Sequence, residues 1–424
     1  MDKQYLCIDL KSFYASVECV DRGLDPMTAK LVVADPERTD KTICLAVSPA
    51  LKALGIPGRA RVFEIPKGID YIMAPPRMAR YVEASAEVYA IYLRFFSKDD
   101  IHVYSIDEAF FDVTNYLSFY GCTARELGER IRQTVLDELG IPATCGLGPN
   151  LYLAKIALDI TAKHSPTFFG ELDVESYRAT LWNHTPLTDF WRIGRGTERR
   201  LHELGIRTMG ELALYPDLEV LYKVFGIDAE ILFDHAWGLE PCTIADIKAY
   251  EPRAHSIVNA QVLGTGYPFE DALLIAKEMC DTSCLEMVKR GVAAESMTMH
   301  VRYDHNVIDG AGGHGTARFG EPTNARSVIM PRTVGLFERI VDREAPIHGI
   351  MLGFNNIMPE EEGSAQLSLF ADEEASAEER SRQEAILDVQ SKFGKNALLK
   401  GIDLMPQATQ QERNRQIGGH KSGE

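Results

Sequence analysis

One stretch decides how the rest of the chain can fold: His102-Val103-Tyr104-Ser105-Ile106-Asp107-Glu108-Ala109-Phe110-Phe111-Asp112-Val113. Aromatic and β-branched residues alternate there with small or polar residues through most of its length, which predicts a β-strand. Two acids, Asp107 and Glu108, stand side by side in its middle. Burying a carboxylate without a partner is strongly unfavourable, and a cation would remove that cost.

A second strand-like run, residues 5–10, carries one acid, Asp9. Three carboxylates on two strands could meet at one edge of a sheet and bind hard divalent cations, which take oxygen ligands. The alternative is that Asp107 and Glu108 flank a strand end and face solvent, while Asp9 caps the next helix. Spacing alone does not choose between the two interpretations.

Both runs resemble motifs of one enzyme family. Residues 105–110, Ser-Ile-Asp-Glu-Ala-Phe, resemble the catalytic signature of the Y-family DNA polymerases, the translesion enzymes of the UmuC/DinB or impB/mucB/samB group. Residues 9–18, Asp-Leu-Lys-Ser-Phe-Tyr-Ala-Ser-Val-Glu, resemble the N-terminal motif of that family. The matches are long, in the right order and at the right separation. The resemblance covers about residues 1–355 and reaches 370 through a short peptide.

The resemblance implies an α+β multidomain fold, a right-hand polymerase. Its palm would have a mixed or antiparallel sheet with helices, and its thumb would be helical. The expected ranges are palm 1–12 and 75–165, small fingers 13–74, thumb 166–244, α+β little finger 252–355, and an acidic, largely disordered tail 356–424.

The resemblance also implies two-metal-ion nucleotidyl transfer with two Mg²⁺ ions. Asp9 and Asp107 would bridge the ions, and Glu108 would complete the site of the ion that activates the primer 3′-hydroxyl. These three acids are the expected catalytic residues. Leu10 would offer its backbone carbonyl to the ion on the triphosphate side.

Further residues match positions that contact the incoming nucleotide. Tyr14 falls at the steric-gate position, where an aromatic ring rejects a 2′-hydroxyl, and it could equally be a core aromatic. Phe13 beside it, Lys52 and Lys163 match triphosphate-binding positions. A surface lysine is the alternative interpretation of Lys163.

One departure from the family concerns the fingers. DinB-type enzymes place an aromatic residue three positions before the basic one, where this chain has Ser48-Pro49. Arg59 or Arg61 could compensate. The departure favours a UmuC-like, Gram-positive branch over a DinB-like one.

Residues 189–206 resemble a helix-hairpin-helix thumb motif. Gly194 and Gly196 would let the backbone approach phosphate, and amide groups at the helix start would bind it. Such DNA-backbone binding is indifferent to sequence.

Periodicity predicts the other elements. Helices are expected at 13–22 with Ser12 as N-cap, 49–54, 78–96, 124–139, 150–162, 269–288, 332–341 and 378–392, strands at 31–34, 42–47, 143–148 and 296–303, and a linker at 245–253.

The net charge of −17 argues at first against nucleic acid, whose phosphates are bound by Lys and Arg. Residues 360–380 contain eight acids against one arginine, so one tail supplies roughly half of the imbalance. Within this tail, residues 366–370 resemble the peptide by which bacterial polymerases bind the sliding clamp, the β subunit. Its expected anchors are Gln366, Leu367, Leu369 and Phe370.

Bulk properties set the remaining expectations. The 424 residues should form several domains. No apolar run reaches about 18 residues and no signal-peptide pattern is present, so a cytoplasmic protein without membrane contact is expected. A monomer is a separate expectation. The eight cysteines contain no Cys-x-x-Cys pair, so neither a disulfide framework nor a zinc site is indicated.

The expected partners are primer–template DNA, dNTPs and the clamp. Two other functions stay open: a palm-type nucleotidyl transferase or cyclase, which would not need the thumb hairpin or clamp peptide, and a catalytically weak or inactive clamp-tethered DNA-binding protein. The sequence leaves undecided the lesion spectrum, the inserted nucleotide, the need for accessory subunits, induction by DNA damage, and a chromosomal or mobile-element origin. Low fidelity is an expectation of the family.

Overall fold

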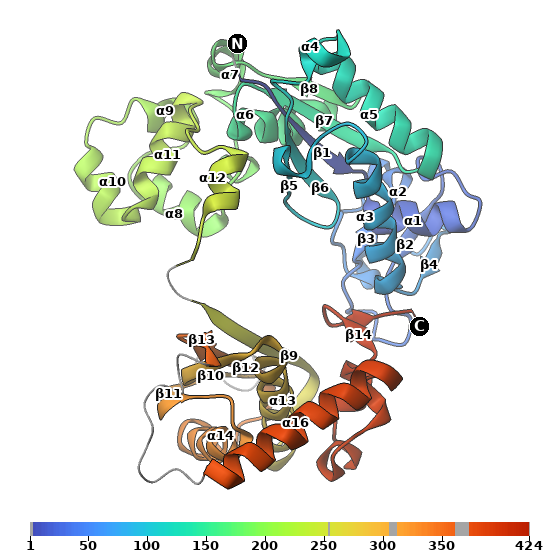
Figure 1. Cartoon of the computed structure of the whole chain (residues 1–424). Coiled ribbons are helices and arrows are strands. Elements are labelled where there is room, and N and C mark those ends of the chain that lie inside the picture. The colour runs from blue at the N-terminus through green and yellow to red at the C-terminus, as the bar shows by residue number, and fades with distance from the viewer. Residues whose placement is uncertain (1–2, 253–254, 305–311, 361–372, 424) are drawn as a thin grey trace. The chain divides into compact units, whose positions relative to one another are not determined.

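The computed structural model describes residues 3–252, 255–304, 312–360 and 373–423. The chain forms two compact units (Figure 1). The first contains residues 1–250 and 420–424, and the second contains residues 251–419. Within the described ranges, no helix is long and apolar enough to cross a membrane.

A five-stranded mixed sheet forms the centre of the first unit. Its spatial order is β5-β6-β1-β7-β8, and all neighbours are antiparallel except β7 and β8. This sheet confirms the expected α+β palm. The strands are β1 (Tyr5–Leu10), β5 (Ile101–Val103), β6 (Glu108–Asp112), β7 (Ala143–Gly148) and β8 (Phe169–Glu171).

Helices of the first unit pack on this sheet or form the neighbouring fingers and thumb. They are α1 (Phe13–Asp21), α2 (Pro49–Ala53), α3 (Met78–Tyr92), α4 (Leu117–Tyr120), α5 (Ala124–Leu139), α6 (Leu151–Ile156), α7 (Val174–Leu181), α8 (Arg195–Glu203), α9 (Met209–Ala213), α10 (Leu218–Phe225), α11 (Asp228–Trp237) and α12 (Ile244–Ala249). The prediction of α5 and of β7 was correct to the residue. Helix α12 occupies most of the predicted linker.

The predicted strand over 102–113 is wrong in one respect, because the structure folds it into a hairpin. The backbone N–H groups of Tyr104 and Ser105 both donate to the Glu108 carbonyl, at 2.9 and 3.1 Å. Residues 104–107 therefore form a turn between β5 and β6. The hydroxyl of Ser105 donates to the Asp107 carboxylate at 2.7 Å, a local bond typical of turns. The turn spares Asp107 the cost of burial in a sheet.

The two faces of the palm sheet pack against different helices. Leu6 and Ile8 of β1 belong to a large core with α3 and α5. Tyr5 and Cys7 point to the opposite face and pack against α6. Because strand residues alternate between faces, Asp9 lies on the α6 side with Cys7.

Glycines in β7 let α6 lie directly on the sheet. A Cβ on Gly146 would lie 2.2 Å from the Ala154 carbonyl oxygen, and one on Gly148 would lie 2.5 Å from the Ala154 nitrogen. After α6 the chain continues as a π-helical turn, Ala157–Thr161, rather than as the predicted α-helix to 162. The opposite side of α6 joins the core of the thumb helices α7 to α11 through Tyr152 and Ile156.

The fingers form a three-stranded sheet of order β3-β2-β4, with β2 (Leu31–Val33), β3 (Ala46–Val47) and β4 (Ile72–Ala74). Only the end of the predicted strand 42–47 is strand. Helix α1, assigned to the fingers from sequence, packs in the palm core. Ser12 precedes it in a left-handed conformation (φ 48°) and caps no amide with its side chain, so its predicted capping role is wrong.

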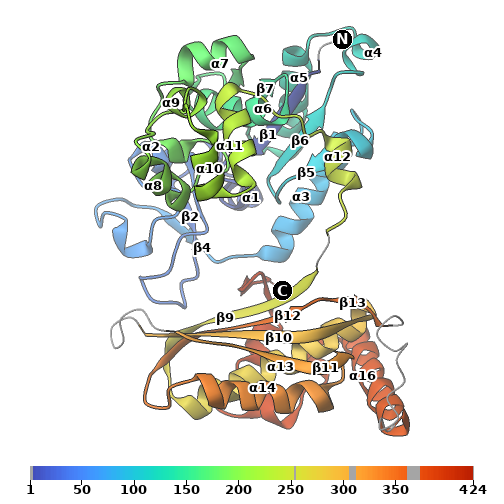
Figure 2. The ribbon, with the colours of Figure 1, turned by 90° about the vertical axis from the view of Figure 1, so that its left-hand side faces the viewer.

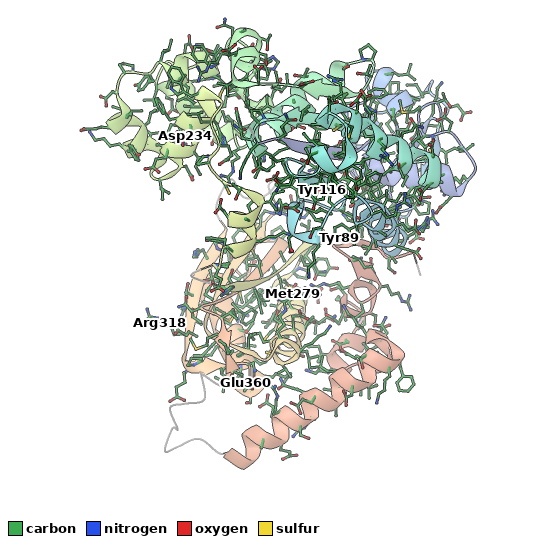
Figure 3. The ribbon with its side chains drawn as sticks, turned by 45° about the horizontal axis from the view of Figure 1, so that its top comes forward. Tyr89, Tyr116, Asp234, Met279, Arg318 and Glu360 are labelled. Carbon is green, nitrogen blue, oxygen red and sulfur yellow. The ribbon has the colours of Figure 1, made fainter. Side chains whose placement is uncertain are left out.

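The second unit contains a five-stranded antiparallel sheet, in which β11-β10-β12-β9 are successive neighbours and the short β13 also pairs with β10. Helices α13 and α14 cover one face of it (Figure 2). Met279 lies in its core, whereas Arg318 projects from its surface (Figure 3). Its elements are β9 (Ser256–Tyr267), α13 (Phe269–Arg290), β10 (Val292–Tyr303), β11 (Gly313–Thr323), α14 (Arg326–Ile340), β12 (Ile347–Asn355) and β13 (Met358–Pro359).

The tail departs from the predicted disorder. Residues 373–393 form helix α16 (Glu373–Phe393), which contains the predicted helix 378–392. Farther along, the buried carboxylate of Glu278 on α13 accepts the N–H groups of Thr409 and Gln410, at 3.0 and 3.2 Å. The composition of the tail indicated a solvated chain. The buried Glu278 carboxylate and the Lys400–Asp281 ion pair (2.8 Å) instead hold this part of the tail on α13.

We expect Gly146→Ala to lower the free energy of unfolding by roughly 1–3 kcal/mol or more, because the methyl group must push α6 off the sheet. Chemical denaturation measures the effect. Gly68→Ala is the control, since nothing lies within 4 Å of its added Cβ. Equal losses in both variants would contradict the close packing of α6 on β7.

Candidate active site

The three predicted acids gather at one end of β1. Asp9 lies directly opposite Glu108 in the antiparallel register of β1 and β6. The N–H of Leu10 donates to the Asp107 carbonyl at 2.9 Å, which fixes the hairpin turn against the end of β1. Two strands and one turn therefore bring Asp9, Leu10, Asp107 and Glu108 together.

Glu108 is held by a buried lysine on α6. Lys155 Nζ lies 2.8 Å from Glu108 Oε2, and the Cys7 thiol donates to Oε1 at 3.2 Å. Lys155 Nζ also lies 3.0 Å from an Asp159 oxygen. Burial alone would lower the pKa of Lys155, but its acidic neighbours more than reverse this and raise that pKa. Lys155 therefore stays protonated and supplies positive charge inside the palm.

Negative charge is crowded around the Asp9 carboxylate. Burial raises its pKa to about 7, with Asp107 and Glu108 acting in the same direction and Lys163 against them. Hard carboxylate oxygens in such a place suit a divalent cation, which would relieve the repulsion.

The donor set fits Mg²⁺ at Asp9 and Asp107, while the Glu108 carboxylate is engaged by Lys155 and Cys7. Within the described ranges, no group of three His, Cys, Asp or Glu side chains converges as a metal site. The metal-binding role of all three acids together stays a prediction.

Several lysines surround the acids. Burial lowers the pKa of Lys52, and Asp9 and Asp107 act against this lowering, so Lys52 lies close to both acids. Lys163 pairs with Asp159 at 2.8 Å and lies close enough to influence Asp9. Lys11 Nζ sits 4.0 Å from the centroid of the Phe168 ring, and burial followed by Lys52 lowers the pKa of Lys11. The positive charges of Lys11, Lys52 and Lys163 near the acids suit a polyphosphate.

Tyr14 lies beside the acids, half-buried. Its ring stacks on Tyr81 with centroids 4.5 Å apart, and burial followed by Asp107 raises the pKa of Tyr14. The Tyr81 hydroxyl donates to the buried Glu18 carboxylate at 2.7 Å, so the stacking platform is rigid. Phe13 differs, because its side chain is buried in the palm core. Only the backbone of Phe13 is left for its predicted contact with the triphosphate.

Ser48 and Arg61 of the fingers make hydrogen bonds within the fingers themselves. Ser48 is buried and its Oγ accepts the Leu31 N–H at 3.1 Å, so this departure from the family has a structural role in the fingers. Arg61 donates to the Lys41 carbonyl at 3.0 Å.

The thumb glycines lie at the start of α8. Gly194 is its N-cap residue in an extended conformation, and no atom lies within 4 Å of a Cβ built on Gly194 or Gly196. Among the described residues, no neighbour requires glycine at these two positions, so the space beside them is open to a backbone contact from outside the chain. Gln366, Leu367, Leu369 and Phe370 lie outside the described residues.

Sequence reasoning missed Lys155 and Lys11 as parts of the site. Lys155 carried a usable signal, since it sits in the otherwise apolar run 151–158 and must therefore find an acidic partner. Tyr81 carried none, because its contact with Tyr14 joins residues 67 positions apart.

A palm sheet with clustered acids, small fingers and a helical thumb defines a right-hand polymerase. The impB/mucB/samB family matches residues 8–159, and the C-terminal domain of the same family matches residues 254–369. The chain belongs to this family, the Y family of DNA polymerases, as predicted.

Similar proteins agree with this membership. The "Putative UV-damage repair protein UvrX" of Bacillus subtilis is 31% identical over 99% of this chain and 98% of its own. "DNA polymerase IV 2" of Halalkalibacterium halodurans is 28% identical over 99% of this chain and all of its own. A solved Y-family DNA polymerase chimera of Dbh and Dpo4 shares the fold, with a TM-score of 0.64, 22% identity and coverage of 84% of this chain and 99% of that chain.

We expect Asp9→Asn to stabilise the metal-free protein at high pH. Folding raises the pKa of the Asp9 carboxyl from 3.8 to about 7. The free energy of unfolding therefore falls as pH rises through that range, because the folded state binds this proton more tightly than the unfolded state does. The variant should gain up to about 4 kcal/mol over the wild type above pH 7 and little near pH 4. Denaturation midpoints at both pH values measure this. Added Mg²⁺ should narrow the gap, and a gap independent of pH would contradict the crowded-carboxylate account.

Proposed function

We propose that this protein is a low-fidelity, template-directed DNA polymerase that copies past damaged bases and uses two Mg²⁺ ions. The observation that carries the proposal is the position of Asp9, which lies opposite Glu108 and beside the turn that carries Asp107, with lysines suited to a triphosphate nearby. Family membership supports the reaction class. The names of relatives, a UV-damage repair protein and several DNA polymerases IV, support a role in DNA damage.

Asp9, Asp107 and the Leu10 carbonyl would hold the metal ions, and Glu108 would join them. Bound Mg²⁺ neutralises charge that develops on the transferring phosphoryl group and lowers the pKa of the attacking hydroxyl. The chain itself orients the substrates. Lys52, Lys163 and the Phe13 backbone would hold the triphosphate, and the Tyr14 ring on its Tyr81 platform would exclude a 2′-hydroxyl.

The DNA would be gripped through its backbone. The open glycine positions at the start of α8 suit phosphate contacts that do not depend on sequence. The second unit would add contacts as the little finger. The fingers consist of one three-stranded sheet and the five-residue helix α2. Fingers this small would cover little of the nascent base pair, which supports tolerance of damaged template bases.

We further propose that residues 366–370 tether the enzyme to the sliding clamp. The support is the sequence Gln-Leu-Ser-Leu-Phe within an acidic segment. A monomeric polymerase of this kind would act in the cytoplasm, where bacterial DNA lies.

The first test is primer extension with Mg²⁺ on undamaged and abasic templates. We expect the wild type to cross the lesion and Asp107→Ala to lose roughly a thousandfold or more of turnover, since the site loses a ligand that stabilises transition-state charge by several kcal/mol. Asp99→Ala, an exposed acid elsewhere in the palm, is the control and should extend like the wild type.

Absence of extension by the wild type, even with clamp and loader, would favour a partner-dependent enzyme or a DNA-binding protein. Full activity of Asp107→Ala would show that the catalytic assignment is wrong.

The second test concerns the sugar. We expect Tyr14→Ala to raise ribonucleotide insertion relative to deoxyribonucleotide insertion by about tenfold or more, since losing about 1.4 kcal/mol of discrimination changes a rate ratio tenfold. Single-nucleotide insertion kinetics with dNTP and rNTP measure it. Tyr14→Phe keeps the ring and should keep the discrimination. If Tyr14→Ala discriminates as well as the wild type, Tyr14 is only a core aromatic.

A further inference from the structure

Trp191 lies where two hydrophobic cores of the first unit meet. It packs against the thumb core and also against the core between α6 and the palm sheet. Its indole Nε1–H donates to the Tyr104 hydroxyl at 3.1 Å. The two rings meet edge to face, with centroids 5.9 Å apart and planes at 80°. A polar and an aromatic contact thus join the thumb to the catalytic hairpin.

On the palm side, Tyr104 opens the turn that carries Asp107. Its N–H donates to the Glu108 carbonyl at 2.9 Å, and the next residue, Ser105, donates to the Asp107 carboxylate at 2.7 Å. Lys155 Nζ, which holds Glu108, lies 5.9 Å from the centroid of the Tyr104 ring. Tyr104 therefore touches the groups that position both acids.

On the thumb side, Trp191 directly precedes the loop at 192–196. The Arg192 guanidinium lies over the indole ring, 5.7 Å from its centroid, and the Arg192 backbone has a φ of 71°. Ile193 is buried and Gly194 caps α8. The conformation of the loop is thus anchored at Trp191.

We propose that the Tyr104–Trp191 contact couples the thumb loop at 192–196 to the hairpin turn, so that DNA bound at the loop stabilises the turn that carries Asp107. Tyr104 and Trp191 are then positioning residues, acting through the turn. The inference rests on the proposed function in one respect, that DNA binds this loop. Loss of an exposed hydrogen bond between two aromatic side chains should lower the free energy of unfolding only slightly. The coupling can therefore be tested separately from stability.

Hydrogen exchange of amides 104–108, with and without primer–template DNA, tests the coupling without catalysis. We expect DNA to slow exchange about two- to tenfold in the wild type, the range that one hydrogen bond can supply. The effect should vanish in Tyr104→Phe, which keeps the phenyl ring, and in Trp191→Phe, which replaces the indole by a smaller aromatic ring without the N–H donor. Tyr120→Phe, which loses a palm hydrogen bond to the Phe95 carbonyl (2.9 Å), is the control and should keep it.

Kinetics give the second readout. Each variant should lower kcat about two- to tenfold with unchanged DNA affinity. The double variant should be no worse than Trp191→Phe alone, because Tyr104→Phe removes a hydrogen bond that Trp191→Phe has already removed. Multiplicative losses in the double variant would overturn the proposal. Thermal unfolding should place Tyr104→Phe close to the wild type, whereas Trp191→Phe loses part of a side chain that packs on two cores and should unfold at a lower temperature.

The outcomes separate this inference from the proposed function. If the wild type extends primers but DNA leaves the turn unprotected, or the variants keep the protection, the coupling is wrong and the polymerase assignment stands. If DNA protects the turn as described but the wild type extends no primer, the coupling stands and the proposed polymerase activity of the chain acting alone fails. A wild type that binds no DNA overturns both.

Discussion

Repulsion among carboxylates at the end of β1 is the constraint on which the palm depends. Asp9, Asp107 and Glu108 share that end, and burial with its neighbours holds the pKa of Asp9 at about 7. Two lysines offset this repulsion: Lys163 acts on Asp9, and Lys155 is buried against Glu108. Removing one partner of a buried ion pair typically costs about 3–5 kcal/mol, so the pair is a strong structural constraint. The same arrangement leaves Asp9 and Asp107 short of positive charge, which a cation can supply.

The placement of Lys155 depends in turn on how closely α6 lies on the sheet. Gly146 and Gly148 remove the side chains that would hold the helix away. The other side of α6 is part of the thumb core. One short helix therefore carries the counter-charge of the active site and anchors the thumb. Trp191 adds a second connection between the same two regions, through Tyr104.

Sequence reasoning went furthest where a local pattern and a motif agreed. Helix α5 and strand β7 were predicted to the residue because the apolar residues of each segment recur with a regular period. The structure adds a Thr123 capping box at the start of α5. It failed where a contact distant in sequence decides the local structure. The run 102–113 reads as one strand, and the bonds of Tyr104 and Ser105 to Glu108 make it a hairpin. The tail reads as disordered by composition, and Glu278 on α13, more than a hundred residues earlier, holds it.

The sequence by itself determined the family, the α+β class and the identity of Asp9, Asp107, Glu108 and Tyr14 as candidate site residues, because these rest on residue types at fixed spacing. Tertiary structure alone decided that Lys155 neutralises Glu108 and that Phe13 turns into the core. It also decided that Tyr14 rests on Tyr81 and that Trp191 reaches the turn at 104–107. Each of these is a contact between segments far apart along the chain. The physical reason is that residue order fixes local periodicity, whereas burial and charge pairing depend on which surfaces meet when the chain packs.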